Sequence, residues 1–177
     1  MCGAQVEERH AAAWRVLESV PDPEVPVLSV CDLGIVREVR PDAAEPAGLE
    51  VVLTPTYSGC PATEVISQSV CEALEQAGLG PVRVSLQRAP AWTTDWISEA
   101  GRRKLREYGI APPGPVSPDG AVPLKFMPRR PGSGSAVDCP RCGSAHTERL
   151  SAFGSTACKA MYRCLACREP FEHFKPI

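Results

Sequence analysis

The sequence lacks a long apolar run and a leader-like N-terminus. Its hydrophobic stretches fall well short of the ~20 residues that cross a bilayer, so we expect no association with a membrane. The first residues, Met1–Trp14, include acidic side chains and contain neither a basic region nor a continuous apolar core, which argues against a secretory signal peptide. We therefore expect a cytoplasmic, reducing environment, where cysteines serve as ligands or reactive thiols rather than in disulfides.

An excess of charge of either sign is also missing. The 19 Lys and Arg residues nearly balance the 21 Asp and Glu residues, which leaves a formal net charge of −2. Such a chain has no strong field to attract nucleic acid or an anionic membrane. Three arginines near the C-terminus, Arg141, Arg163 and Arg168, are too few to form a broad basic face. We therefore expect no binding of nucleic acid.

Proline and cysteine, in contrast, are abundant, with 19 and 9 residues. Prolines, glycines and serines fill the stretch Ala111–Ser135, which has no apolar periodicity. This composition predicts a first domain at 1–111, an extended linker at 112–135 and a second domain at 136–177. A segment of about 40 residues rarely folds on a hydrophobic core alone, so we expect a metal or a disulfide in the second domain.

The first domain alternates between helical and extended patterns. Helices are predicted over 6–20, 61–78 and 95–109, and strands over 34–41, 49–54 and 82–88. The middle helix has an apolar stripe at Ile66, Val70 and Leu74 and a candidate C′ glycine at Gly78. Thr94 is a candidate N-cap for the last helix. The order α-β-β-α-β-α predicts a small α+β domain with helices packed on a three-stranded sheet.

One cysteine, Cys60, stands at the joint between the second strand and the middle helix. Pro61 suits the first helical position, because its missing N–H would have no partner there. Cys60 would then occupy or neighbour the N-cap, where the helix dipole and free N–H groups favour a thiolate. Gly59 permits an unusual backbone and the close approach of a partner. Cys60 is therefore either a reactive or ligating thiol, or a small buried residue in a tight turn.

Acidic residues gather before the first strand. Asp22 and Glu24 lie in a proline-rich turn, and Asp32 precedes Leu33 and Gly34. Asp residues in such places commonly form local hydrogen bonds to the backbone, so a purely structural role in turns is one reading. A functional role for the three acids is the other.

The second domain contains two C-x2-C pairs. The cysteines are Cys139, Cys142, Cys164 and Cys167. Each pair forms a turn that directs two sulfurs at one point, and two such turns complete a tetrahedral site with no open position. The spacing predicts a rubredoxin-like zinc ribbon with a structural metal, and iron is the alternative occupant because it accepts the same ligands. A thiol–disulfide enzyme is disfavoured, since both pairs stand at ribbon spacing.

Cys158 is left outside these pairs. It precedes Lys159 and comes six residues before Cys164. It is either an extra ligand, a surface thiol made more acidic by the lysine, or a buried strand residue. We favour burial.

Two long motifs carry a family resemblance. "DPEVPVLSVCDLGIVREV" followed by "TPTYSGCPATEVI" resembles the Fe–S-assembly domain of SufT-like proteins, which share a DPE-type turn, a D-L-G step and a Thr-rich strand that ends in G-C-P. The stretch "AWTTDWISEAGRRKLREYGIAPP", joined to the four-cysteine ribbon, is similar to the PaaD (or PaaJ) family of the phenylacetyl-CoA epoxidase system. The resemblance extends from about Val6 to Lys175.

The resemblance implies a cytoplasmic accessory protein of aerobic phenylacetate degradation that is not itself catalytic. Its expected task is to help an Fe–S or iron-containing partner, especially the reductase component, to receive its cluster. The family positions fall on Asp22, Glu24, Asp32 and Cys60, with Thr54 and Thr56 on the adjoining strand.

The expected metals are thus a structural zinc and a transient Fe–S cluster, and a homodimer is one arrangement that would supply further ligands. The alternative is an assembly subunit that bridges oxygenase components and handles no metal through Cys60.

Overall fold

The computed structural model describes residues 3–45, 47–57, 59–114 and 137–177. The chain divides into two compact units, Met1–Gly101 and Arg102–Ile177, which are described separately. The predicted linker, 112–135, lies outside the described residues from 115 onward. Within the described ranges, no helix combines the length and the apolar character needed to cross a membrane.

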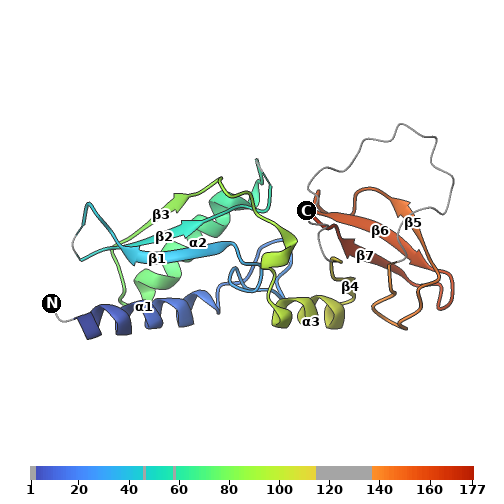
Figure 1. Cartoon of the computed structure of the whole chain (residues 1–177), viewed down its shortest axis with the longest axis horizontal. Coiled ribbons are helices and arrows are strands. Elements are labelled where there is room, and N and C mark those ends of the chain that lie inside the picture. Colours follow the sequence, from blue (N-terminus) through green and yellow to red (C-terminus); the bar gives the residue numbers. More distant parts are fainter. Residues whose placement is uncertain (1–2, 46, 58, 115–136) are drawn as a thin grey trace. The chain divides into compact units, whose positions relative to one another are not determined.

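The first unit contains the predicted α+β arrangement (Figure 1). Its elements are α1 (Gly3–Leu17), β1 (Val36–Pro41), β2 (Leu49–Leu53), α2 (Ala62–Gln76), β3 (Val82–Leu86) and the 3₁₀ helix η1 (Thr94–Trp96), before α3 (Glu99–Tyr108) begins. The sheet has the order β1-β2-β3, with β1 and β2 antiparallel and β2 and β3 parallel. The parallel pair is connected through α2, which crosses over the sheet.

Both long helices cover the same face of this sheet. Helix α1 contacts α2 and β1, and α2 contacts β3. The predicted apolar stripe of α2 is buried, with Ile66, Val70 and Leu74 at 5%, 0% and 0% exposure. Gly78 follows the C-cap residue Ala77 and has φ +73°, as expected of a C′ glycine.

Two local predictions for the first unit are wrong. The sequence of 34–41 predicts a strand in which Ile35, Arg37 and Val39 lie on one face and Val36, Glu38 and Arg40 on the other. An irregularity between Val36 and Glu38 breaks this alternation in β1, so that Val36 and Val39 are both buried. The last helix does not begin at a Thr94 N-cap. Thr93 instead caps the short η1 helix, and the chain is extended at Ile97 before α3 starts.

The second unit contains the four-stranded sheet of the ribbon. Strands β4 (Ile110–Ala111), β5 (Thr147–Ser151), β6 (Lys159–Cys164) and β7 (Pro170–Phe174) pair in the order β4-β7-β6-β5. Strand β4 runs parallel to β7, and its two residues pair with Glu172 and His173. The division between the two compact units falls inside α3, and Ile110–Ala111 pairs within the second sheet.

Candidate functional site

Cys60 lies in the segment that joins β2 to α2, directly before the helix begins. Pro61 occupies the N-cap position of α2 with φ −65°, whereas the sequence predicted it at the first helical position. The N–H of Thr63 donates to the carbonyl of Cys60 at 3.2 Å, and the N–H of Cys60 donates to the carbonyl of Tyr57 at 3.3 Å. Cys60 is half-buried. It thus stands at the end of α2 where unpaired N–H groups and the dipole favour negative charge.

Gly59 gives the turn before Cys60 its shape. Its φ is +83°, in the left-handed region that other residues rarely adopt. Apart from its chain neighbours, no described residue has an atom within 4 Å of the place that a Cβ would take, so the backbone conformation and not crowding calls for glycine.

Cys60 lines a pocket of about 620 Å³. Its lining residues are Pro55, Gly59, Cys60, Pro61, Thr63, Glu64, Leu86 and Arg88. Thr63 and Glu64 come from the beginning of α2, whereas Leu86 and Arg88 come from the end of β3 and the residues after it. Sulfur and carboxylate oxygen are both ligands for iron and zinc, and the pocket brings one of each together with a guanidinium of opposite charge.

Two other cysteines of the first unit have different surroundings. Burial, with the nearby carboxylates of Glu18 and Asp32, raises the pKa of Cys31 to about 12. Burial and the neighbouring Glu75 also raise the pKa of Cys71. A raised pKa disfavours the thiolate, which is the form that binds metal or acts as a nucleophile. Neither lines the pocket at Cys60.

Asp22 forms local hydrogen bonds to the backbone of its turn, which is the structural role that the sequence analysis gave as one reading. Its Oδ1 accepts hydrogen bonds from the N–H groups of Glu24 at 2.9 Å and Val25 at 2.7 Å. Asp22 is buried, with 5% exposure, and Glu24 is half-buried. Neither acid lines the pocket at Cys60.

Asp32 connects the D-L-G turn to the start of α3. Its carboxylate accepts hydrogen bonds from the N–H of Ser29 at 3.0 Å and the hydroxyl of Ser98 at 3.2 Å. The N–H of Ser98 also donates to the carbonyl of Asp32 at 2.9 Å. Nearby, Gly34 has φ +67°, and a Cβ there would lie 2.5 Å from the carbonyl oxygen of Trp96. Through these contacts Asp32 joins the D-L-G turn to the residues before α3. Asp32 does not line the pocket at Cys60.

The two threonines lie between β2 and Cys60. Thr54 is 1% exposed, and its N–H donates to the carbonyl of Ile35 at 2.9 Å. Its Oγ1 has no hydrogen-bond partner among the residues that the structure describes. Thr56 is half-buried. Pro55, between them, reaches the pocket lining, whereas the two threonines do not.

Besides Pro55, sequence reasoning missed four residues of the pocket wall, Thr63, Glu64, Leu86 and Arg88. The first two could have been found, because positions i+3 and i+4 from Cys60 lie near it on a helical turn. The other two depend on the parallel register of β2 and β3, in which Leu53 pairs with Leu86. No local pattern indicates that register.

The second unit brings the four predicted cysteine sulfurs together. The sulfurs of Cys139, Cys142, Cys164 and Cys167 all lie within 4.8 Å of one another. The Cys139–Cys167 and Cys142–Cys164 sulfur distances are 3.8 and 3.6 Å. A tetrahedral zinc site with Zn–S bonds of about 2.3 Å has sulfurs about 3.8 Å apart. The group therefore fits a structural metal held by four thiolates.

Cys158 does not belong to this group. It is 3% exposed, and its sulfur lies 3.0 Å from the hydroxyl oxygen of Thr156. The adjacent Lys159 is also buried and forms an ion pair with Glu172 at 3.1 Å. The expectation of burial thus agrees with the structure, and Cys158 is not a surface thiol.

Comparisons with known proteins support both units. Residues 10–86 match the family model described as iron-sulfur cluster assembly protein, and residues 126–175 match the PaaD zinc beta ribbon domain. A protein of Escherichia coli (strain K12), provisionally named as the D component of 1,2-phenylacetyl-CoA epoxidase, is 49% identical over 164 residues. The match covers 93% of this chain and 91% of that protein.

Solved structures resemble the chain in fold. The crystal structure of a domain of unknown function, DUF59, from Bacillus anthracis has 24% identity and a TM-score of 0.53, and the match covers 59% of this chain and 97% of that chain. A conserved hypothetical protein from Thermotoga maritima has 30% identity and a TM-score of 0.43, with 52% and 89% covered. The first likeness supports the α+β fold, and the second is too low in TM-score to add to it. On the long match to the E. coli protein and the two family models, the chain belongs to the PaaD family of phenylacetyl-CoA epoxidase components.

Proposed function

We propose that the protein is an accessory subunit of a phenylacetyl-CoA epoxidase system and acts in the maturation of its Fe–S or iron-containing partners. The relative with 49% identity is named as a subunit of that epoxidase, which implies further subunits as partners. The match of residues 10–86 to an Fe–S cluster assembly family supports a role in delivering the metal. The catalytic steps of epoxidation belong to the other subunits, and the site of action is the cytoplasm.

The observation that carries this proposal is the position of Cys60. It is half-buried, lines a pocket of about 620 Å³ and precedes the N-cap of α2. Cys31 and Cys71 do not line this pocket, and partial burial raises the pKa of each of these two thiols. Of these three thiols, Cys60 thus has the surroundings best suited to contact a metal on a docked partner.

A single thiol does not hold an Fe–S cluster, since four ligands are usual. The partner, with the Fe–S reductase component as the first candidate, or a second copy of the chain, supplies the remaining ligands. Asp22, Asp32 and Thr54 act as positioning residues, because they are buried in the segments before β1 and after β2. Glu24 and Thr56 are half-buried in the same segments.

The four-cysteine group of the second unit holds zinc in this proposal. Cys139, Cys142, Cys164 and Cys167 would all be ligands, which leaves no open position for chemistry. The metal would supply folding energy to the second unit, because two of the metal's ligands, Cys139 and Cys164, are part of the hydrophobic core of that unit. Its role is therefore structural.

Replacing the thiol tests the maturation role. In cells that co-express the epoxidase system with a Cys60→Ser variant, we expect the partner to contain less iron and acid-labile sulfide than with the wild-type chain. Cys71→Ser is the matched control, since Cys71 lies in the same unit and on α2. Full cluster loading with Cys60→Ser would remove Cys60 from the proposed function.

A structural assembly subunit is the second candidate. It is favoured by the exposed apolar side chains Leu150 and Phe153 in the ribbon, at 51% and 65% exposure. In that case Cys60→Ser would leave both complex formation and epoxidase activity intact. Measuring both in the same preparation separates the two candidates.

A further inference from the structure

The chain segment that connects β5 to β6 exposes the most accessible large apolar side chain among the described residues. Phe153 is 65% exposed, and Leu150 near the end of β5 is 51% exposed. Single exposed apolar residues are common on protein surfaces, so exposure alone carries no inference. What distinguishes this segment is how firmly its backbone is held.

An ion pair between β6 and β7 holds the segment that connects β5 to β6. The ammonium of Lys159, whose side chain is 3% exposed, lies 3.1 Å from a carboxylate oxygen of Glu172. The other oxygen of Glu172 accepts a hydrogen bond from the N–H of Ser155 at 2.5 Å, and the N–H of Gly154 donates to the carbonyl of Lys159 at 2.8 Å. A Cβ at Gly154 would lie 2.5 Å from the Glu172 carboxylate, so glycine fits closely there. The residues that follow the exposed ring are therefore fixed to the sheet.

The ring of Phe153 is itself held by Lys175. The ammonium nitrogen lies 4.6 Å from the ring centroid and donates to the carbonyl of Ala152 at 3.4 Å. A cation over an aromatic face restricts the ring by electrostatic attraction. Within the described part of the chain, Lys175 forms no ion pair with an Asp or Glu side chain. Its positive charge is therefore available to a carboxylate of another molecule.

We propose that Leu150, Phe153 and Lys175 form a docking surface, here called the ribbon knob, for another subunit of the epoxidase system. The matching surface is an apolar pocket that accepts the Phe153 ring, with a carboxylate at its rim that meets Lys175. Exposed aromatic side chains that are already ordered lose little conformational entropy on binding and are frequent anchors of interfaces. The identity of the partner rests on the proposed function.

Charge favours a different protein over a second copy of this chain. A two-fold symmetric contact places the same surface patch on both sides. Such a contact would bring two Lys175 ammoniums into one interface, and like charges there oppose association. A partner pocket with an acidic rim has the opposite, favourable arrangement.

The test uses the full tagged chain, co-expressed with the remaining subunits of the epoxidase system. We expect Phe153→Ala and Lys175→Glu each to weaken association at least tenfold, measured by titration of the purified partner complex. Tyr108→Ala is the matched control, because Tyr108 is an aromatic residue of the same unit with 58% exposure and lies outside the ribbon knob. Metal content and melting temperature verify that each variant is folded.

Association unchanged by Phe153→Ala, or weakened equally by Tyr108→Ala, would overturn the docking surface. A loss confined to self-association, seen by light scattering of the chain alone, would overturn the choice of partner. Cys60→Ser separates this proposal from the maturation role, since it should still associate with the partner while cluster loading falls. If Cys60→Ser loads clusters fully and Phe153→Ala still abolishes association, the docking surface stands and the maturation role does not.

Discussion

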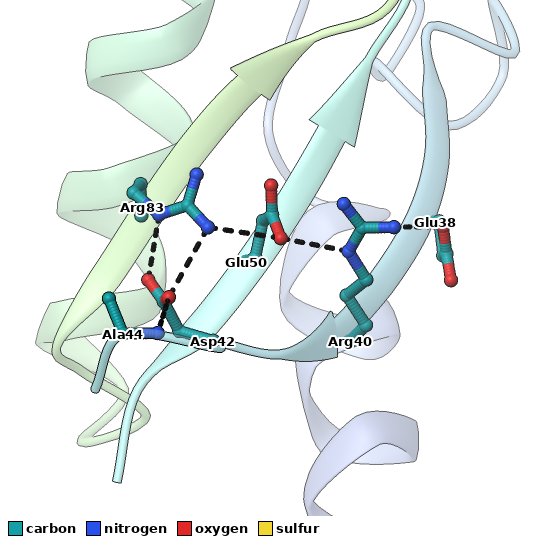
Figure 2. Close-up of polar contacts among 6 residues, drawn as sticks. All are labelled: Glu38, Arg40, Asp42, Ala44, Glu50 and Arg83. Atoms are coloured by element: carbon teal, nitrogen blue, oxygen red, sulfur yellow. Dashed lines mark hydrogen bonds and ion pairs between the residues drawn. The ribbon is translucent and has the colours of Figure 1, made fainter. Parts of the chain in front are cut away.

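Glu50 on β2 accepts a hydrogen bond of 2.8 Å from the guanidinium of Arg40 on β1. The same carboxylate oxygen lies 3.1 Å from Arg83 on β3, and Arg83 in turn pairs with Asp42 at 2.8 Å. Figure 2 shows these side chains side by side across the three strands. Arg40, Glu50 and Arg83 are neighbours in register, alternating with the apolar positions of the sheet. The two carboxylates are buried, whereas both arginines are half-exposed and shield them from water.

This network predicts acid sensitivity in the first unit. The hydrogen bond from Arg40 lowers the pKa of Glu50 to about 2, and the one from Arg83 lowers the pKa of Asp42. In the unfolded chain these groups have pKa values of about 4.3 and 3.9. The folded state thus binds fewer protons, and its added stability is complete above pH of about 5 and is lost as pH falls toward about 2.

The measurement is the melting temperature of the full chain between pH 7 and pH 2. Glu50→Gln should lower the melting temperature by a few degrees at pH 7 and flatten its decline in acid. Glu38→Gln is the control, because the Glu38 side chain is 53% exposed at the edge of the network. Equal pH dependence in the wild type and in Glu50→Gln would contradict this role of Glu50.

Cys31, Cys60 and Cys71, the thiols in the described part of the first unit, should differ in reactivity. With the folded chain at neutral pH, iodoacetamide should modify Cys60 before Cys31 and Cys71, because burial raises the pKa of the latter two. Peptide mass spectrometry after a time course gives the three rates. Modification of Cys31 as fast as Cys60 would mean that the thiol in the pocket has no special accessibility.

Metal removal should unfold the second unit selectively. The sheet around Cys139 and Cys164 has a small core, and structural zinc contributes on the order of 10 kcal/mol to such domains. A strong chelator, or Cys142→Ser, should abolish the near-ultraviolet signal of Tyr162, whose ring stacks on Phe171 with centroids 5.8 Å apart. The first unit should keep its helical signal.

Elemental analysis of the same protein identifies the metal. One zinc per chain is expected, and cobalt substitution should give the visible bands of a tetrahedral four-thiolate site. If the protein is red and contains iron, the metal of the four-cysteine site is iron and not zinc. A ribbon that is folded without any metal would contradict the structural role of the four cysteines.

The sequence was sufficient to predict most features that depend on local pattern. The stripe at Ile66, Val70 and Leu74 and the glycine at Gly78 predicted α2, since helical periodicity and capping are set within a few residues. The two C-x2-C pairs predicted the four-sulfur group, because metal geometry restricts their arrangement strongly.

Features that depend on distant pairing were not predictable in this way. The pairing of Ile110–Ala111 with β7 joins residues about 60 positions apart, and nothing in the short apolar pair indicates its partner. The wall of the pocket at Leu86 and Arg88 depends on the parallel register with β2. The irregularity in β1 between Val36 and Glu38 shifts the faces of a strand whose sequence reads as simple alternation.

The role of Cys60 is tested most directly by the iron and acid-labile sulfide content of the purified reductase component. Four co-expression strains are compared, with the wild-type chain, with Cys60→Ser, with Cys71→Ser and with no chain. We predict that Cys60→Ser gives the low cluster content of the strain without the chain, while Cys71→Ser gives the wild-type content. A cluster content with Cys60→Ser equal to that of the wild type would contradict the maturation role of this thiol.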